Sequence, residues 1–521
     1  MWYITGNREI KVAREYHENT KHSFASVRFG RHYLNPLNQP SAYKIYPNLE
    51  AIPLPSEFPS PHENGLKAVS TYNVEVDKEQ SLNLNLLASI LYYSAGQTKK
   101  LRFPGGAYYF RAAASAGALY PVEIYIVCKD IPELDAGLYH FSPRDFMLRR
   151  LRVGDYRGEL SRSAGYRQDI SGAPVTIVLT SIFWRSAWKY QARSYRYCLW
   201  DTGTILSNIL ATASANKLSH TVITGFIDSV VNHLLGVDGE HEGALCLVPV
   251  GSSSATSTSE ERTIVPPIAA ETIPLSNDQV DYPEIIRMHK ESCLTKEEVN
   301  SWVRPSSEAS QRAAGKGYGL IPIDRSSLSR TSLSEVIRLR GSSRRFAYES
   351  ISFSHLSCIL EHSTRGIPAD FPGERGASLN DIYIIVNAVD DLTQGAYLFS
   401  SSNKKLELLK SGNFRSMSGY LCLEQALGND ASAVVFFLAD LRKILDRYGN
   451  RGYRACQIEA GILGGKMYLC AYSLGLGATG LTFYDDDVTD FFSPHASGKS
   501  AIFVVALGVP YRSKHSPSGK F

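Results

Sequence analysis

The 521-residue chain has few cysteines, no excess of one charge and no long apolar run. Its eight cysteines include no Cys-x-x-Cys pair, which argues against a disulfide framework or a structural zinc site and favours a reducing compartment. Lysine and arginine number 55 against 51 acidic residues, so the net charge of +4 gives no reason to expect nucleic-acid binding.

Membrane and secretion signals are also missing. The longest charge-free apolar stretch, residues 467–484, contains three glycines and predicts a buried helix followed by a loop rather than a membrane span. The first residues, Met1 to Thr5, lack the basic-then-apolar build of a signal peptide. We therefore expect a soluble cytoplasmic protein with no membrane contact and no metal site.

The chain does have an internal repeat, which should be sought before local structure is assigned. Five pairs of segments share a spacing of 258 residues: 124–127 with 382–385, 137–141 with 395–399, 173–181 with 431–439, 193–196 with 451–454, and 201–203 with 459–461. Towards the start of each copy the spacing becomes 269, because Ile90-Leu91 matches Ile359-Leu360. Copy one therefore has eleven extra residues in or around 105–120. Five matches in one register predict two copies of one fold.

Each copy has the pattern of an α+β fold. In copy one, apolar positions between 84 and 91 indicate a helix, and apolar runs at 122–127, 175–180 and 245–250 indicate strands. A long helix of low charge is expected from about 195 to 215, with its twin from about 453 to 473. These two helices are apolar on more than one face, so we expect them at the centre of an intrachain pseudo-dimer.

The predicted domain organisation has four parts. These are an N-terminal arm over 1–75, copy one over 76–251, a linker over 252–330 and copy two over 331–521. Serines and threonines at 252–259 followed by Pro266-Pro267 are typical of a linker. The arm is rich in aromatic residues and proline and is interpreted as wrapped on the core, with a functional lid as the alternative.

Copy two carries motifs that copy one lacks. Residues 338–346 place four arginines beside a Gly-Ser turn, and forked guanidiniums with backbone N–H groups suit a phosphate monoester. A solvated basic face is the alternative. Three glycines within 475–480 would let a flat ring lie against bare backbone, although a simple helix stop also explains them. The chain ends with a second candidate phosphate contact at Arg512 and Lys514, whereas copy one has Glu75 where copy two has Arg344.

Copy one keeps a different set. Residues 111–121 form a small-residue loop that offers a hydroxyl, free N–H groups and an aromatic side chain. Lys189-Tyr190 precedes the long helix; such a dipeptide usually lies at the surface, but beside a ring-binding loop it is a candidate proton-transfer pair. Because the losses in the two copies are complementary, the sequence predicts one composite site between them rather than two sites.

These residues resemble the nitroreductase superfamily, specifically its SagB/ThcOx-type dehydrogenases in tandem form. The family's R-x-S-x-R element is similar to residues 340–344, its late glycine motif to 475–480, and its P-S-A-G-A-L-Y-P element to 114–121, with Ala114 in place of the first proline. The resemblance implies two tandem nitroreductase-like folds that hold FMN between them at one site, with the pseudo-symmetric second site empty.

It also implies roles for individual residues. The residues assigned to FMN are Arg340, Ser342, Arg344, Ser115, Ala116, Gly117, Ala118, Leu119, Gly475, Leu476, Gly477, Gly480, Arg512 and Lys514, and those assigned to catalysis are Lys189 and Tyr190.

The leading functional hypothesis is an FMN-dependent dehydrogenase that oxidises thiazoline or oxazoline rings to azoles in a ribosomal peptide. Tyr190 or Lys189 would remove the Cα proton, and dioxygen would reoxidise the flavin. The alternatives are an NAD(P)H-dependent nitro- or quinone reductase and a non-catalytic scaffold of a modifying complex. Expected partners are a peptide or small-molecule substrate and a cyclodehydratase, and dimerisation beyond the pseudo-dimer stays open.

Overall fold

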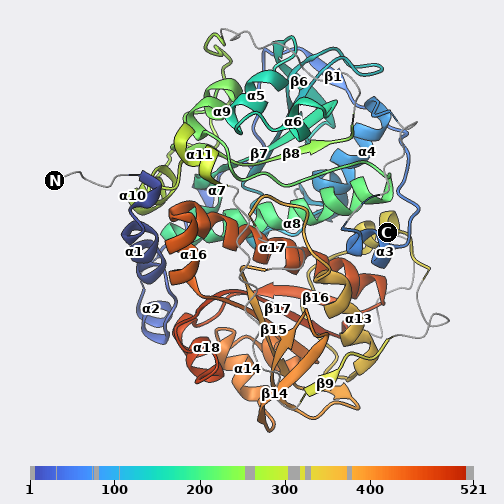
Figure 1. Ribbon diagram of the computed structural model, residues 1–521, viewed down its shortest axis with the longest axis vertical. Helices are drawn as coiled ribbons and strands as arrows, with labels where there is room; N and C mark the ends of the chain where they lie inside the picture. Colours follow the sequence, from blue (N-terminus) through green and yellow to red (C-terminus); the bar gives the residue numbers. More distant parts are fainter. Residues whose placement is uncertain are drawn as a thin grey trace.

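The computed structural model describes residues 6–30, 32–72, 74, 81–104, 106–252, 265–302, 317–322, 330–371 and 378–511. Two sheets with their covering helices lie on either side of a central pair of helices (Figure 1). This arrangement confirms the α+β pseudo-dimer expected from the repeat.

The sheets are built mainly from antiparallel pairs. The copy-one sheet has the order β1 (Ala51–Pro53), β6 (Met147–Val153), β5 (Gly137–Ser142), β4 (Val122–Cys128), β7 (Val175–Ile182), β8 (Glu242–Val250). The copy-two sheet has the order β16 (Gly477–Leu481), β17 (Ser500–Gly508), β15 (Ala433–Ala439), β11 (Asp381–Val386), β13 (Gly395–Ser400), β14 (Lys405–Ser411), β9 (Gly317–Gly319). Two short ladders pair β2 (Gln97–Phe103) with β3 (Gly106–Arg111), and β10 (Ile351–Ser352) with β12 (Val389–Asp390).

Helices cover both sheets. Those up to the end of copy one are α1 (Lys11–Asn19), α2 (Phe24–Phe29), α3 (Gly65–Ser70), α4 (Leu84–Ala95), α5 (Arg157–Ser163), α6 (Gln168–Ser171), α7 (Phe183–Tyr190), α8 (Ser194–Ala215) and α9 (Asp228–Leu235). Those that follow are α10 (Pro283–Lys290), α11 (Lys296–Trp302), α12 (Leu333–Leu339), α13 (Phe353–Ser363), α14 (Arg415–Leu421), α15 (Ala426–Asp430), α16 (Leu441–Tyr448), α17 (Asn450–Ser473) and α18 (Asp485–Phe492). No helix in these described ranges is long and apolar enough to cross a bilayer.

The central helices α8 and α17 are buried along almost their whole length, as their composition predicts. Glycines allow their backbones to approach closely. A Cβ atom on Gly203 would lie 2.5 Å from the carbonyl oxygen of Ile458, and one on Gly461 would lie 2.5 Å from that of Trp200. Both glycines come from the repeated motif, so the repeat marks the contact between the two copies.

The repeated Arg-x-Tyr-Arg motif forms ion pairs that cross between the copies. Arg193 and Arg196 at the start of α8 bind the carboxylate of Asp485, the first residue of α18, at 2.8 and 2.7 Å. Arg451 and Arg454 at the start of α17 bind Asp228, the first residue of α9. All six side chains are buried, with at most 4% exposed.

Replacing either aspartate should therefore destabilise the whole pseudo-dimer. Asp228→Asn or Asp485→Asn leaves two guanidinium charges buried without a counter-charge, which is expected to cost about 3–5 kcal/mol in urea unfolding. Asp446→Asn is the control, because its pairs with Arg14 and Arg442 are exposed and contribute at most about 1 kcal/mol. Equal unfolding midpoints for the three variants would contradict this account.

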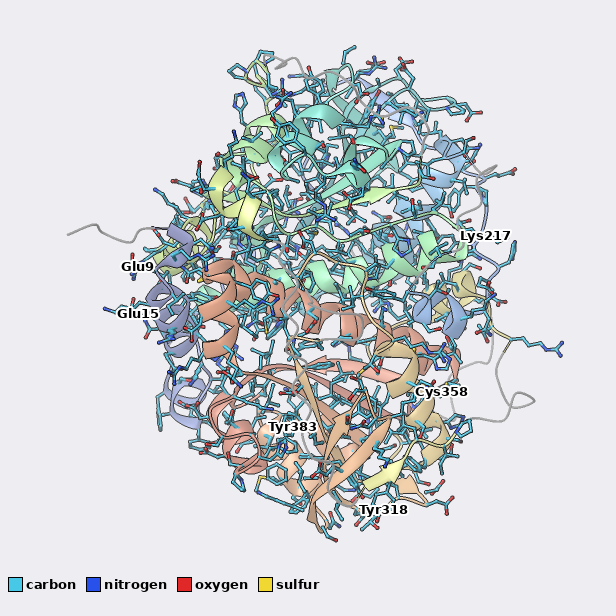
Figure 2. The ribbon with its side chains drawn as sticks, in the orientation of Figure 1. Glu9, Glu15, Lys217, Tyr318, Cys358 and Tyr383 are labelled. Carbon is cyan, nitrogen blue, oxygen red and sulfur yellow. The ribbon has the colours of Figure 1, made fainter. Side chains whose placement is uncertain are left out.

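The repeat also reaches into the predicted arm and linker. His17 in α1 and His289 in α10 occupy matching places, because each ring bonds a tyrosine of the Arg-x-Tyr-Arg motif, Tyr453 at 3.2 Å and Tyr195 at 3.1 Å. The two helices lie together (Figure 1), and Glu15 of α1, labelled in Figure 2, pairs with Arg287 of α10 at 3.1 Å. The sequence signal that we missed is His-x-x-Ser/Thr, repeated 272 residues apart.

Both sheets take an edge strand from outside the predicted copies. Strand β1 pairs with β6, and β9 pairs with β14, although β1 lies in the arm and β9 in the linker. Tyr318 of β9 and Tyr383 of β11 lie in the same copy-two half of the molecule (Figure 2). The domain boundaries at 75 and 330 stay predictions, but the arm and linker are more than a wrapping segment and a spacer.

Candidate active site between the two copies

The small-residue loop and the Lys-Tyr pair of copy one lie together. Gly117 has a φ of +61°, and a Cβ atom there would lie 2.7 Å from the hydroxyl oxygen of Tyr190. Tyr190 is the last residue of α7, and the Lys189 ammonium lies 5.3 Å from the centre of its ring. Both side chains are half-buried. A glycine is therefore required at 117 by its conformation and by the tyrosine above it.

A buried acid fixes this loop. The carboxylate of Asp201 in α8 accepts hydrogen bonds from the Ser115 hydroxyl at 2.6 Å and the Ala116 N–H at 3.0 Å. Burial raises the pKa of Asp201 to about 7. In copy two the matching acid, Glu459, accepts from the Ser378 hydroxyl at 2.8 Å. The repeated acid therefore has the same structural role in both copies.

The far end of the loop is held by an aromatic side chain. Ala118 adopts a φ of +54°, and its carbonyl oxygen accepts a 2.6 Å hydrogen bond from the Tyr108 hydroxyl. Leu119 is buried, with 5% exposed. The backbone of residues 115–119 is thus fixed at both ends.

Arginine 340 of copy two reaches this loop. Its guanidinium is buried and donates to the carbonyl oxygens of Ala112 at 2.9 Å and Arg111 at 3.0 Å. Arg344 is exposed. Its positive charge lies close enough to Tyr190 to oppose the rise that burial causes in the pKa of the Tyr190 hydroxyl. The Arg-x-Ser-x-Arg element of copy two and the loop and Lys-Tyr pair of copy one are therefore parts of one place in the fold.

The Arg-x-Ser-x-Arg element of copy two also contacts the glycine motif. The Ser342 hydroxyl lies 3.3 Å from that of Tyr468, which accepts the N–H of Gly480 at 2.5 Å. A Cβ atom on Gly477 would overlap the side chain of Ser343. Gly475, with a φ of +73°, is exposed in a turn with open space at its Cβ, and Leu476 beside it is 7% exposed.

The glycine motif differs in one respect from the loop that we expected. Residues 477–481 form the edge strand β16, because they pair along their whole length with β17. Within the motif, only Gly475 and Leu476 lie outside the strand. Its outward backbone groups are already bonded: the Ala478 carbonyl oxygen accepts the Ser343 N–H at 3.0 Å, and the Gly480 N–H donates to the Tyr468 hydroxyl. The glycines therefore let the backbone of this strand lie close to the Arg-x-Ser-x-Arg element.

Lys99 of strand β2 is a site residue that sequence reasoning missed. Its ammonium donates to the carbonyl oxygens of Leu339 at 2.8 Å and Arg340 at 2.7 Å, across the copy boundary. Burial and the neighbouring Arg340 charge lower its pKa to about 8. No local motif marks this lysine; the only sequence signal is its closeness to the eleven extra residues of copy one.

The basic side chains of this site are not paired with acids in the described ranges. Among the described residues, no carboxylate forms an ion pair with Lys99, Arg340, Arg344 or Arg345. A cluster of this kind, next to hydroxyl groups and free backbone, fits a phosphate-bearing ligand. Arg512, Lys514 and Glu75 lie outside the described residues.

The pseudo-symmetric place in copy one is covered by the chain itself. At the spacing of 258, Val222 to Gly225 match residues 480–483, which are the last two residues of β16 and the two that follow, and here residues 367–371 of copy two lie on them. The Val222 N–H donates to Pro368 at 2.8 Å, and the Asp370 carboxylate accepts from the N–H groups of Thr224 and Gly225 at 2.9 and 2.8 Å. Copy-two residues therefore cover this backbone in copy one, whereas the backbone of β16 is bound by Ser343 and Tyr468 of its own copy.

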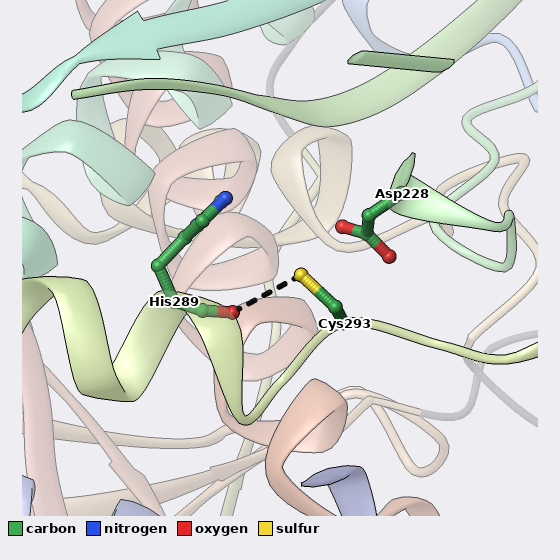
Figure 3. Close-up of side chains that lie close together, drawn as sticks. All are labelled: Asp228, His289 and Cys293. Carbon is green, nitrogen blue, oxygen red and sulfur yellow. Dashed lines mark hydrogen bonds between the residues drawn. The ribbon is translucent and has the colours of Figure 1, made fainter. Parts of the chain in front are cut away.

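A cluster elsewhere resembles a metal site by residue type. Asp228, His289 and Cys293 place a carboxylate, an imidazole and a thiol close together (Figure 3). However, Arg451 and Arg454 both bind Asp228, and Arg454 also reaches the His289 ring at 3.0 Å. Two guanidinium charges oppose a divalent cation, so we assign this cluster to the ion pairs between the copies.

Comparison with known proteins matches both copies to one family. The model described as "Nitroreductase family" matches residues 77–252 and 337–509. Protein MJ1384 of Methanocaldococcus jannaschii, which carries a nitroreductase name, is 27% identical over 33% of this chain and 81% of its own length.

Two further relatives carry names from peptide processing. Trifolitoxin-processing protein TfxB of Rhizobium leguminosarum is 27% identical over 32% of this chain, and microcin B17-processing protein McbC of Escherichia coli is 28% identical over 25% of it. The matches span about half the length of these two relatives, 46% and 49%.

One solved structure covers the whole architecture. A crystal structure of an Anabaena variabilis protein with a nitroreductase name is 27% identical, has a TM-score of 0.75, and covers 96% of this chain and 99% of its own. The tandem arrangement is therefore shared by at least one solved protein.

Proposed function

Because this chain belongs to the nitroreductase family, whose members typically use flavin, we propose that it is an FMN-dependent dehydrogenase of the SagB type. We propose that it oxidises thiazoline or oxazoline rings to azoles in a ribosomal peptide. The observation that carries this proposal is the Tyr190 hydroxyl above Gly117, with Lys189 beside it, at a site that copy two completes. The relatives named for trifolitoxin and microcin processing support a peptide substrate.

The residues of the site fit FMN. Arg344 would bind the phosphate through its exposed guanidinium, and the Ser342 hydroxyl and the remaining N–H groups of Arg340 would hold the phosphate and ribityl chain. The loop at 115–119 and the glycine motif at 475–480 would lie near the ring, and Arg512 and Lys514 stay proposed phosphate contacts. When bound, FMN supplies the hydride acceptor for the oxidation.

The two candidate catalytic side chains differ in their environment. Burial, followed by the nearby Tyr197 and Asp201, raises the pKa of Tyr190, so its hydroxyl keeps its proton at neutral pH. We propose that the Lys189 amine, which lies half-buried over the Tyr190 ring, removes the substrate Cα proton and that the Tyr190 hydroxyl orients the substrate ring. Both side chains come from α7, so the distance between them is fixed by one helix.

The substrate ring must be made before it can be oxidised. A cyclodehydration of cysteine, serine or threonine supplies that ring, so a cyclodehydratase is the proposed partner. An NAD(P)H-dependent nitro- or quinone reductase is the second candidate, favoured by the nitroreductase name of the full-length solved relative.

Anaerobic mixing of the FMN-loaded protein distinguishes the two functions. Bleaching of the flavin by a thiazoline peptide, with thiazole as the product, supports the dehydrogenase. Fast bleaching by NAD(P)H with no change in the thiazoline supports the reductase. Failure to bind FMN after reconstitution would favour the non-catalytic scaffold.

Lys99 predicts a pH dependence for FMN binding. Below pH 8 its ammonium is charged, and a bound phosphate stabilises that charge and raises the pKa further. Affinity is therefore full below pH 8 and falls as the pH rises through 8, by up to about tenfold per pH unit.

Quenching of FMN fluorescence between pH 7 and 9 measures this dependence. Lys99→Met should flatten it, whereas Lys100→Met, on the opposite face of the same strand, should leave it unchanged. Parallel pH profiles for the wild type and Lys99→Met would show that Lys99 does not act on the phosphate.

A further inference from the structure

The hairpin formed by β2 and β3 distinguishes copy one from copy two. It follows α4 and leads directly into the loop at 112–121. In copy two the described residues after α13 form no such hairpin. The hairpin thus accounts for the extra residues of copy one. They lie where the repeat borders the proposed active site.

The base of the hairpin touches both halves of that site. Lys99 binds the backbone at Arg340 of copy two, and Tyr108 binds the carbonyl oxygen of Ala118 in copy one. Because side chains alternate along a strand, Leu101 and Phe103 lie on the same face as Lys99. Their cross-strand partners are Tyr108 and Gly106. This face therefore continues outward from the site as an apolar surface.

The outer half of β2 is open to solvent. Leu101 is 57% exposed and Phe103 is 52% exposed. In the described part of the chain neither β2 nor β3 pairs with a third strand. An exposed strand edge with apolar side chains is a template for an added strand.

The charge of the hairpin indicates what it binds. Residues 97–111 contain four basic residues and no acidic one. Arg111 is buried, with its guanidinium on the Ala42 carbonyl, and Lys99 faces Arg340. Lys100 and Arg102 remain exposed on the face opposite Leu101. An acidic chain would complement them.

We propose that the free edge of β2 receives an extended, acidic stretch of the substrate peptide as an added strand. The backbone of the peptide would pair with β2, its apolar side chains would contact Leu101 and Phe103, and its acidic side chains would meet Lys100 and Arg102. The base of β2 lies at the proposed site, because Lys99 binds the Arg340 carbonyl there, so a peptide that runs along β2 would carry its ring towards the site. The inference rests on the proposed function for the nature of the substrate.

Binding can be measured without turnover. The probes are fluorescein-labelled 15-residue peptides with one central thiazoline, flanked by four glutamates or by four lysines, and anisotropy is measured with the FMN-loaded protein. The glutamate peptide is expected to bind about tenfold more tightly than the lysine peptide. Lys100→Glu/Arg102→Glu should reverse this preference, while Lys404→Glu/Lys405→Glu at the β13–β14 turn should leave it unchanged.

Backbone pairing is tested by two N-methylated versions of the glutamate peptide. One version is methylated at the odd-numbered backbone nitrogens and the other at the even-numbered ones. Because only every second N–H of an added strand faces its neighbour, one version should lose about tenfold in affinity and the other should bind normally.

Equal affinity for the two charge versions, or for the two methylated versions, would overturn the proposal. A change of oligomeric state in the hairpin variant without a change in peptide affinity would also overturn it, in favour of a contact between copies. Peptide binding as expected but without flavin bleaching would leave the docking surface in place and refute the dehydrogenase.

Discussion

The wild-type chain is expected to carry about one FMN, and Arg344→Ala is expected to bind FMN 10- to 100-fold more weakly. Arg344 is exposed and makes no described ion pair, so its removal leaves no cavity and no buried group unpaired. Loss of one charge-assisted phosphate contact costs about 1.5–3 kcal/mol, which corresponds to that range of affinity. The released flavin is counted by its absorbance against the protein concentration.

The stoichiometry follows from the difference between the two copies. In copy one, residues 367–371 bind the backbone at Val222 to Gly225, whereas in copy two the backbone of β16 is bound by Ser343 and Tyr468, next to the predicted phosphate element. Arg442→Ala is the control, because that exposed arginine lies on α16 and its one ion pair there is weak, at 4.0 Å. Two FMN per chain would show that the second place also binds, and full binding by Arg344→Ala would place the phosphate elsewhere.

Lys189→Ala is expected to lower the rate of azoline oxidation by about 10²–10⁴-fold while FMN stays bound, because general-base catalysis contributes that factor. Lys189 contacts no residue of the predicted phosphate element in the described structure, so the cofactor content should not change. The rate is followed by anaerobic single-turnover bleaching with a thiazoline peptide.

Tyr190→Phe separates orientation from proton transfer. The variant keeps the ring next to Tyr197, whose centre lies 4.5 Å away, and removes only the hydroxyl above Gly117. We expect a smaller loss of rate, about tenfold, that does not vary with pH. Wild-type rates for both variants, with FMN bound, would refute the proposed roles and direct attention to the reductase.

Much of the fold could be read from the sequence because it depends on local patterns. The long apolar helices, the strand runs and the spacing of 258 residues are periodic features of the chain, and α8, α17 and the two sheets lie where these patterns predict. The candidate site residues could be chosen because the repeat shows which copy kept which motif. That comparison required no knowledge of distances.

Other features could not be read in this way, because they join residues far apart in the chain. Arg196 binds Asp485 and Arg454 binds Asp228, so each motif binds an acid of the other copy. The acids at the start of α9 and α18 do repeat, as Phe226-x-Asp228 and Phe483-x-Asp485, but residue order does not show that each binds the arginines of the other copy. Lys99 likewise becomes a site residue only when the hairpin reaches the end of α12.

By itself the sequence determined that this chain has two nitroreductase-like copies with complementary motifs, because repeats, glycines and apolar periodicity are written in residue order. Only the tertiary structure decided that the glycine motif is a sheet edge, that residues 367–371 cover the matching edge in copy one, and that a basic hairpin stands beside the site. Each of these depends on which backbone edges meet, and strand pairing between distant segments is set by the packing of the whole molecule rather than by local pattern.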